Sequence, residues 1–264
     1  MIKKVVNRIK NKLVAEDLFP ENAQLLDLFG DRAKGYLLGT SIAINNFDLT
    51  NLEEDALKIT MGNFYEHPEI KKINPSIHLF AASHPPITET VLRNWWGRCD
   101  TVLPKGIPVM VAHTDKEIAE AVFSYREVYY YSYGGEFPID FCNQIISPWS
   151  VSVLGVQLAL YLRSKNTYML GIDHDWRHKA PYRHFYTHEE PCLEYYLFQE
   201  GLFKKGLKTP TKVNMPPKSS LYKFYELYQQ HETLNSYAEQ LGLNVFNGDL
   251  NSIFDVYGRK EYTN

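Results

Sequence analysis

Apolar runs and helical periodicities alternate along most of the chain. Short apolar runs predict strands at residues 35–39, 56–61, 77–82, 101–103, 109–112, 127–132, 167–172 and 243–246. Apolar residues that recur every three or four positions predict helices at residues 20–32, 88–96, 115–124, 151–163, 192–204 and 220–241. This alternation predicts an α/β fold, a mostly parallel sheet with helices on both faces.

The same pattern suggests how the chain is divided. Residues 1–34 are predicted to form an N-terminal helical segment, and residues 35–264 one large α/β domain. Residues 209–220 contain three prolines and predict a loop, within a lid or insertion over about 174–219. The segment 151–163 is nearly all apolar, so we expect a helix buried against the sheet.

Composition excludes several classes of protein. The formal net charge of -3 argues against a nucleic-acid-binding protein, which would usually show a basic stripe. Cys99, Cys142 and Cys192 are widely spaced, which favours a reducing compartment over a disulfide framework or a cysteine-based zinc site. No apolar run approaches the ~20 residues that span a bilayer, and the N-terminus lacks a signal-peptide core. We therefore expect a cytoplasmic protein.

Residues 2–14 read as a basic amphipathic helix. Apolar residues lie on one helical face and lysines and arginine occupy the remainder. One interpretation is a surface helix docked on the core. The other is a peripheral anchor at the inner face of a membrane, close to a lipid-linked acceptor.

The most informative stretch is residues 168–175, an apolar run closed by Gly171 and followed by Asp173 and Asp175. It predicts a buried strand that delivers carboxylates to its carboxyl end, where open α/β sheets bind ligands. These carboxylates could cap the next segment, hold Mg²⁺ with a diphosphate, or accept hydrogen bonds from sugar hydroxyls. His174 and His178 could bind a metal if that stretch were helical, although Pro181 favours a loop.

Polar groups also follow the first two strands. Gly39-Thr40-Ser41 could hold a phosphate through backbone amides and hydroxyls, although it matches neither GxGxxG nor GxxxxGK[ST], and a plain turn is the alternative. Asn63 could contact a base or ribose edge, or act as a turn residue.

A second histidine pair, His184 and His188, lies further along the same aromatic-rich segment. A histidine placed on a hydroxyl makes a good general base near pH 7, and Glu189 could tune it. The alternative is a pair of solvated loop histidines. His231 lies within the last predicted helix, where packing or a surface position is expected.

The order of these motifs resembles the bacterial sialyltransferases of glycosyltransferase family 42. In chain order these motifs are the Gly39-Thr40-Ser41 turn, Asn63 followed by an aromatic residue after the second strand, and a buried helix. They continue with Tyr-x-x-Gly-Ile-Asp, which ends at Asp173, and His-aromatic-x-x-His, from His184 to His188. It is similar as well to Maf-type flagellin glycosyltransferases and to archaeal hydroxymethylpterin pyrophosphokinase. The resemblance covers about residues 35–252, with an insertion between His188 and Ser220. It departs at residues 39–43, which replace Gly-Asn-Gly-Pro-Ser, and at Ala82, which replaces an asparagine.

This resemblance implies a Rossmann-like, GT-A-like nucleotide-sugar fold, a flexible lid and metal-independent transfer from a CMP-sugar. It implies that His188 is the general base, with His184 and Asp173 also in the catalytic site. The resemblance further implies a set of donor-binding residues: Gly39, Thr40, Ser41, Asn63, Ser83, Ser150, Ser152, Gly171, Asp173, Asp175, Tyr182 and Tyr186. Within that set, Ser150 or Ser152 would meet the donor carboxylate, Asp173 the ribose, and Tyr182 or Tyr186 the leaving phosphate.

The leading hypothesis is therefore a bacterial glycosyltransferase of surface-polysaccharide or lipooligosaccharide assembly. Its partners would be a nucleotide-sugar donor and a glycan or glycolipid acceptor, with no cofactor, and homo-oligomerisation is left open. One alternative is a Mg²⁺-dependent diphosphokinase in which Asp173 and Asp175 hold the ion. Another is a non-catalytic nucleotide-sugar fold that serves as an assembly partner.

Overall fold

A parallel β-sheet forms the centre of the computed structural model, which describes residues 17–174, 184–187, 191–202 and 217–262. Over these residues the sheet has nine strands in the order β6-β5-β4-β3-β2-β1-β7-β8-β9, and every neighbouring pair is parallel. The strands are β1 (Lys34–Leu38), β2 (Leu57–Met61), β3 (Ile77–Leu79), β4 (Val109–Ala112), β5 (Val128–Tyr133), β6 (Gln144–Ile145), β7 (Asn166–Leu170), β8 (Asn244–Asn247) and β9 (Gly258–Arg259). The predicted α/β fold class is confirmed.

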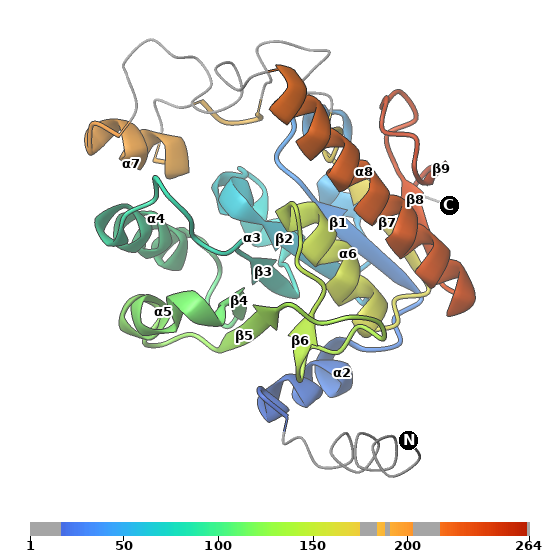
Figure 1. Ribbon diagram of the computed structural model, residues 1–264, viewed down its shortest axis with the longest axis horizontal. Helices are drawn as coiled ribbons and strands as arrows, with labels where there is room; N and C mark the ends of the chain where they lie inside the picture. Colours follow the sequence, from blue (N-terminus) through green and yellow to red (C-terminus); the bar gives the residue numbers. More distant parts are fainter. Residues whose placement is uncertain (1–16, 175–183, 188–190, 203–216, 263–264) are drawn as a thin grey trace, which may run out of the picture.

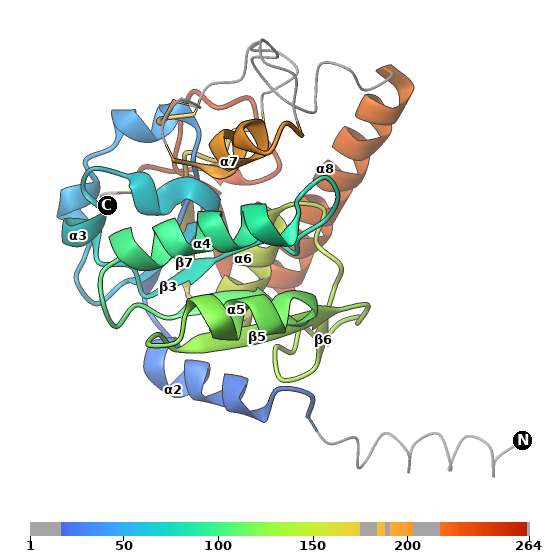
Figure 2. The same cartoon turned by 90° about the vertical axis from the view of Figure 1, so that its left-hand side faces the viewer.

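Helices cover both faces of this sheet (Figures 1 and 2). One face carries α6 (Val151–Tyr161) and α8 (Pro217–Gln240), which pack on each other. The opposite face carries α3 (Ile70–Ile73), α4 (Glu89–Val102) and α5 (Lys116–Val122), with α7 (Leu193–Gln199) against α4. The remaining helical elements are α2 (Gln24–Phe29), η1 (Pro20–Ala23), η2 (Ile42–Asn46), η3 (Leu49–Asn51), η4 (Gly62–Glu66) and η5 (His113–Asp115).

Central strands such as β1 and β7 supply both hydrophobic cores because successive side chains point to opposite faces. Leu37 and Met169 join the core under α6 and α8. Their neighbours Leu38 and Tyr168 join the core under α3, α4 and α5. Parallel strands buried on both faces read as continuous apolar runs, which is why the sequence pattern located them.

Three sequence-based assignments need correction. Residues 101–103, predicted as a strand, belong largely to the last turn of α4, whose buried face continues through Trp96 and Cys99. The predicted loop over 209–220 already contains the start of α8 at Pro217, because proline is well tolerated in a first helical turn. Strands β6 and β9 were not predicted, since each is only two residues long.

The described part of the N-terminal segment packs on the same domain. Leu25 is fully buried in the core under α6 and α8. The Asn22 side chain donates hydrogen bonds of 2.7 Å to the carbonyls of Tyr130 and Phe141. The amphipathic residues 2–14 lie outside the described residues. Among the helices that the structure describes, none is long and apolar enough to cross a membrane.

The strand order reverses between β1 and β7, and the two strand ends are held together there by backbone contacts. The Gly39 N–H donates to the Leu170 carbonyl (2.8 Å) and the Ser41 N–H to the Gly171 carbonyl (3.0 Å). Gly171 has a φ of +65°, and a Cβ there would lie 2.9 Å from both the Gly39 carbonyl oxygen and the Ile44 Cβ. Glycine is therefore required for this close approach.

Replacing Gly171 with alanine should destabilise the protein more than the same change at Gly242. Both residues have a positive φ, but a Cβ at Gly242 meets no atom within 4 Å. Gly242→Ala should therefore cost about 1 kcal/mol of unfolding free energy, the strain alone. Gly171→Ala should cost about 1–3 kcal/mol more, because its methyl group displaces packed backbone. Urea denaturation of the two variants measures the difference, and equal losses would contradict the role given to this contact.

His78 predicts how stability depends on pH. Its ring is fully buried between the Thr60 hydroxyl (2.8 Å) and the Gly62 carbonyl (3.0 Å). Burial lowers its pKa from 6.5 to about 3. Between these values the unfolded chain binds a proton that the folded chain does not, so stability declines as pH falls from 6.5 towards 3.

His78→Gln should therefore flatten the dependence of unfolding free energy on pH in this window. The expected decrease in slope is about 1.4 kcal/mol per pH unit, the contribution of one proton. Urea denaturation at several pH values measures it. His113→Gln, which changes an exposed ring, is the control, and matching slopes in the two variants would refute the assignment.

Candidate functional site

A pocket of about 120 Å³ opens at the carboxyl ends of β1, β2 and β7. In open α/β sheets ligands bind at the point where the strand order reverses, and this pocket occupies that point. Its lining consists of Gly39, Thr40, Met61, Gly62, Ser150, Val151, Ser152, Gly171, Ile172, Asp173 and His174. Six of the predicted donor-binding residues are therefore brought together: Gly39, Thr40, Ser150, Ser152, Gly171 and Asp173.

The N-terminus of α6 meets this pocket. Ser150 is the N-cap, and its hydroxyl accepts a hydrogen bond from the Val153 N–H (3.3 Å). The first turn of a helix carries unpaired N–H groups and the positive end of the helix dipole. Because Ser150, Val151 and Ser152 all line the pocket, it is suited to a phosphate or a carboxylate.

Asp173, which follows β7, contacts the turn after β1. Ser41 is buried beside the pocket, and its hydroxyl donates a short hydrogen bond to the carboxylate of Asp173, itself only 4% exposed. Here Asp173 joins the two loops that form the pocket walls. Its predicted contact with a ribose stays a prediction.

Residues 184–187 lie against the same turn. The Phe185 N–H donates to the Thr40 carbonyl (3.2 Å), and Ser41 and His184 form an antiparallel bridge. The Nδ1 atom of His184 lies 3.1 Å from the Thr40 hydroxyl, and its ring stacks on Tyr186 with centroids 4.8 Å apart. The structure therefore places His184 next to a pocket residue.

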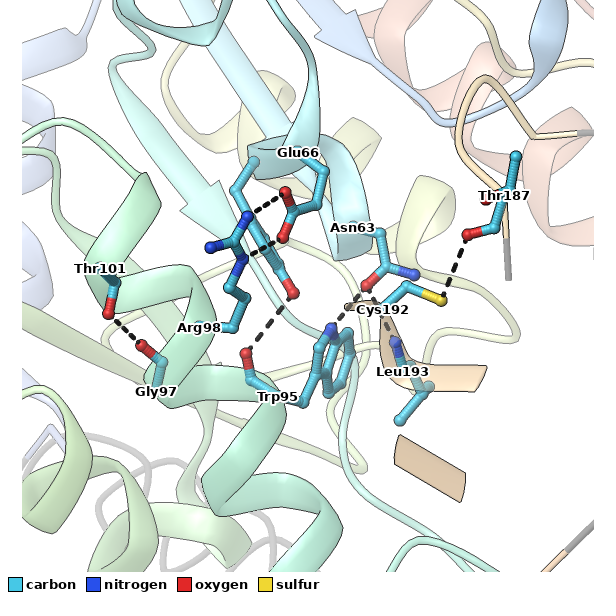
Figure 3. A network of polar contacts seen from close by, with 10 residues as sticks. Asn63, Glu66, Trp95, Gly97, Arg98, Thr101, Thr187, Cys192 and Leu193 are labelled. Atoms are coloured by element: carbon cyan, nitrogen blue, oxygen red, sulfur yellow. Dashed lines mark hydrogen bonds and ion pairs between the residues drawn. The ribbon is translucent and has the colours of Figure 1, made fainter. Parts of the chain in front are cut away.

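Asn63 lies apart from the pocket lining, in a buried polar network (Figure 3). Its Oδ1 accepts hydrogen bonds from the Trp95 indole (2.5 Å) and the Leu193 N–H (3.3 Å). Its Nδ2 donates to the Tyr186 hydroxyl (2.8 Å) and to Glu194 (3.3 Å). These contacts tie Tyr186 and the start of α7 to Trp95 of α4, so the amide acts here as a structural clamp.

Two more predicted donor-binding residues lie outside the pocket lining. Ser83 follows β3 and bonds through its N–H (2.9 Å) and hydroxyl (2.5 Å) to the carboxylate of Asp115. Tyr186 is buried, with its hydroxyl on Asn63. For Asn63, Ser83 and Tyr186 a role in donor binding stays a prediction. The predicted base His188, together with Asp175 and Tyr182, lies outside the described residues.

Two histidines with no predicted role in donor binding or catalysis contact the pocket residue Ser152. His174 lines the pocket, and its Nε2 lies 2.9 Å from the Ser152 hydroxyl. His231 is fully buried, which excludes the surface position, and its Nε2 lies 3.1 Å from the same hydroxyl. A signal for burial was present, because Leu227, Leu234 and Ala238 share the helical face of His231. The contact with Ser152 is a tertiary feature that periodicity does not contain.

Metal ligands do not gather in the described residues. Within 17–174, 184–187, 191–202 and 217–262, no group of three or more His, Cys, Asp or Glu side chains could hold a metal ion. Cys99, Cys142 and Cys192 are all buried and free. Among the described residues that line the pocket, one carries a carboxylate, Asp173.

No family model and no curated protein matches this chain. Among solved structures, the monofunctional alpha-2,3-sialyltransferase Cst-I from Campylobacter jejuni is similar at 10% identity and a TM-score of 0.49, over 86% of this chain and 80% of that one. The sialyltransferase CstII from Campylobacter jejuni, in complex with the substrate analogue CMP-3FNeuAc, gives 11% and 0.47 over 86% and 85%. These matches give the Maf-type and pterin pyrophosphokinase branches no support. With these TM-scores below 0.5, the function proposed for this chain relies on its own residues.

Asn63→Ala should loosen the segment that the clamp holds. Losing four hydrogen bonds and leaving the Trp95 indole unpaired should cost about 2–4 kcal/mol of unfolding free energy. Hydrogen exchange should also accelerate in α7 before it does in the sheet. Urea denaturation and exchange mass spectrometry measure the two effects.

The control is Asn51→Ala, which removes an exposed hydrogen bond to Asp48. It should change stability by no more than about 0.5 kcal/mol. If α7 exchanged at the wild-type rate in Asn63→Ala, Asn63 would not be the clamp.

Proposed function

We propose that this chain is a glycosyltransferase that takes a sugar from a nucleotide donor. The observation that carries the proposal is the pocket at the β1–β7 reversal, which combines a glycine-hydroxyl turn with the N-terminus of an apolar helix. A nucleotide-sugar needs a place for its phosphate, and this combination provides unpaired N–H groups, hydroxyls and a favourable dipole. The motif order supports the same assignment.

In this proposal the pocket stabilises the departing phosphate. Negative charge grows on the phosphate oxygen as the glycosyl bond breaks. Hydrogen-bond donors that are fixed in advance at that position lower the barrier. Thr40 carries a hydroxyl at the pocket, and the α6 N-terminus supplies N–H groups and the dipole. Ser41 and Asp173 hold the two walls of the pocket, so its N–H and O–H groups do not need to reorganise.

The finer assignments follow from the sequence resemblance. The donor is a CMP-linked acidic sugar, the acceptor is a glycan or lipid-linked hydroxyl compound, and no metal is required. His188 takes the proton of the acceptor hydroxyl as that oxygen attacks the anomeric carbon. The enzyme works in the cytoplasm of a bacterium, and residues 2–14 hold it at the inner membrane face.

A thermal-shift screen of the full chain tests the donor class. CMP, UDP, GDP and ATP compounds are compared, each with Mg²⁺ and with EDTA. A ligand that binds only the folded chain adds about 2.7 kcal/mol of stability at a hundredfold excess over its Kd. We expect CMP compounds to raise the melting temperature equally in EDTA. A shift with ATP that needs Mg²⁺ would favour the diphosphokinase, and no shift with any nucleotide would favour the non-catalytic alternative.

His188→Ala should lower the rate of transfer from the donor by about 100- to 10,000-fold, the contribution of a well-placed general base. The thermal shift with CMP should persist, because the base acts on the acceptor. Turnover is measured with labelled donor, and His113→Ala, at an exposed ring, serves as the control. Wild-type turnover in His188→Ala would remove the assigned base.

A further inference from the structure

A file of hydrogen-bonded side chains runs from the pocket into the core. The hydroxyls of Ser150 and Ser152 lie 2.6 Å apart, and both residues line the pocket. From Ser152 the file continues to His174 (2.9 Å) and to His231 (3.1 Å). The Nδ1 atom of His231 then lies 2.9 Å from the hydroxyl of Tyr257. None of His174, His231 and Tyr257 has a role in the proposed transfer.

At the buried end, formed by His231 and Tyr257, only one placement of the hydrogens pairs both groups. Burial raises the pKa of the Tyr257 hydroxyl and lowers the pKa of His231, so the phenol is protonated and the imidazole is neutral. The phenol must donate its hydrogen to His231 Nδ1, since the reverse direction would bury an O–H without an acceptor. A neutral ring has one N–H, which is then on Nε2 and points at Ser152.

Ser152 has one hydrogen for three partners. Its oxygen accepts from His231, which leaves Ser150 and His174. In one arrangement Ser150 donates to Ser152, and Ser152 donates to His174 Nε2. In the other, His174 carries a hydrogen on Nε2 and donates to Ser152, which donates to Ser150. Both arrangements give the Ser152 hydroxyl and the His174 Nε2 atom a partner, and they differ in where hydrogens sit along Ser150, Ser152 and His174.

We propose that Ser150, Ser152 and His174 form a proton relay along the wall of the pocket, with His231 and Tyr257 as positioning residues. The relay rests on the proposed function and gives that site a second route for the acceptor proton. The acceptor O–H breaks as its proton passes to Ser150, the Ser150 proton passes to Ser152, and the Ser152 proton passes to His174 Nε2. The acceptor oxygen bonds to the anomeric carbon, and the glycosyl-phosphate bond breaks with its electron pair on the phosphate.

Aromatic rings pack around the two histidines. The Phe254 ring packs edge-on against both His174 and His231, with centroids 4.9 Å away in each case. Phe254 also packs against Tyr257 and Tyr228. These rings keep the histidines in place, so the proton shift requires hydroxyl rotation and no movement of heavy atoms.

Nitrogen NMR of histidine-labelled protein without any ligand tests the hydrogen-bond directions. His231 should appear as the Nε2–H tautomer. Tyr257→Phe removes the donor to Nδ1, so the His231 signal should change to a mixture of tautomers. Tyr131→Phe is the matched control, because it removes another buried hydroxyl, which bonds to the Phe80 carbonyl (3.2 Å), and it should leave His231 unchanged. An Nδ1–H tautomer in the wild type would overturn the proposal.

Turnover with the donor found in the thermal-shift screen tests the relay itself. Because His188 provides the other route, the relay is tested in the His188→Ala background. There, adding His174→Gln should lower the remaining kcat about 100-fold and adding Tyr257→Phe about tenfold, with an unchanged KM for the donor. An unchanged remaining kcat when His174→Gln is added to His188→Ala, in an enzyme that transfers, overturns the relay alone. Absence of transfer from every donor, with the His231 tautomer as expected, overturns the proposed function and leaves the hydrogen-bond directions standing.

Discussion

The close approach of two backbones, at Gly39 and Gly171, is the constraint on which the site depends. Two hydrogen bonds join the ends of β1 and β7 at this point. The adjacent residues, Ser41 and Asp173, then come within hydrogen-bond distance of each other. A side chain at either glycine would meet the opposing loop, so the pocket exists because both positions lack a Cβ.

The apolar helix α6 supplies the other half of the site. Residues Ser152 to Leu160 are all buried against the sheet and α8. This burial fixes the axis of the helix, and with it the direction in which its first turn points. Ser150 and Ser152 therefore present their hydroxyls at the pocket from a rigid element, which favours a site that is organised before a ligand binds.

Much of the fold could be predicted from the sequence, since strands buried on both faces read as apolar runs, and glycine or polar residues mark where they end. The same reasoning located Gly39 and Asp173, because the carboxyl ends of parallel strands share one edge. It could not locate contacts made by distant segments. The hydrogen bonds of Asn63 to Tyr186 and Glu194 are contacts of this kind. So is the contact of His231 with Ser152, across 79 positions of sequence. Residues 101–103 predict a strand but end α4, because a helix end and a short strand share one apolar pattern.

A crystal structure with CMP tests the central claim most directly. The account predicts phosphate density at the N-terminus of α6, between the turn at Gly39 and Thr40 and the loop from Gly171 to Asp173. The nucleotide would then extend along the carboxyl edge of the sheet. Ordered CMP elsewhere on the molecule, with this pocket closed by protein side chains, would contradict the account.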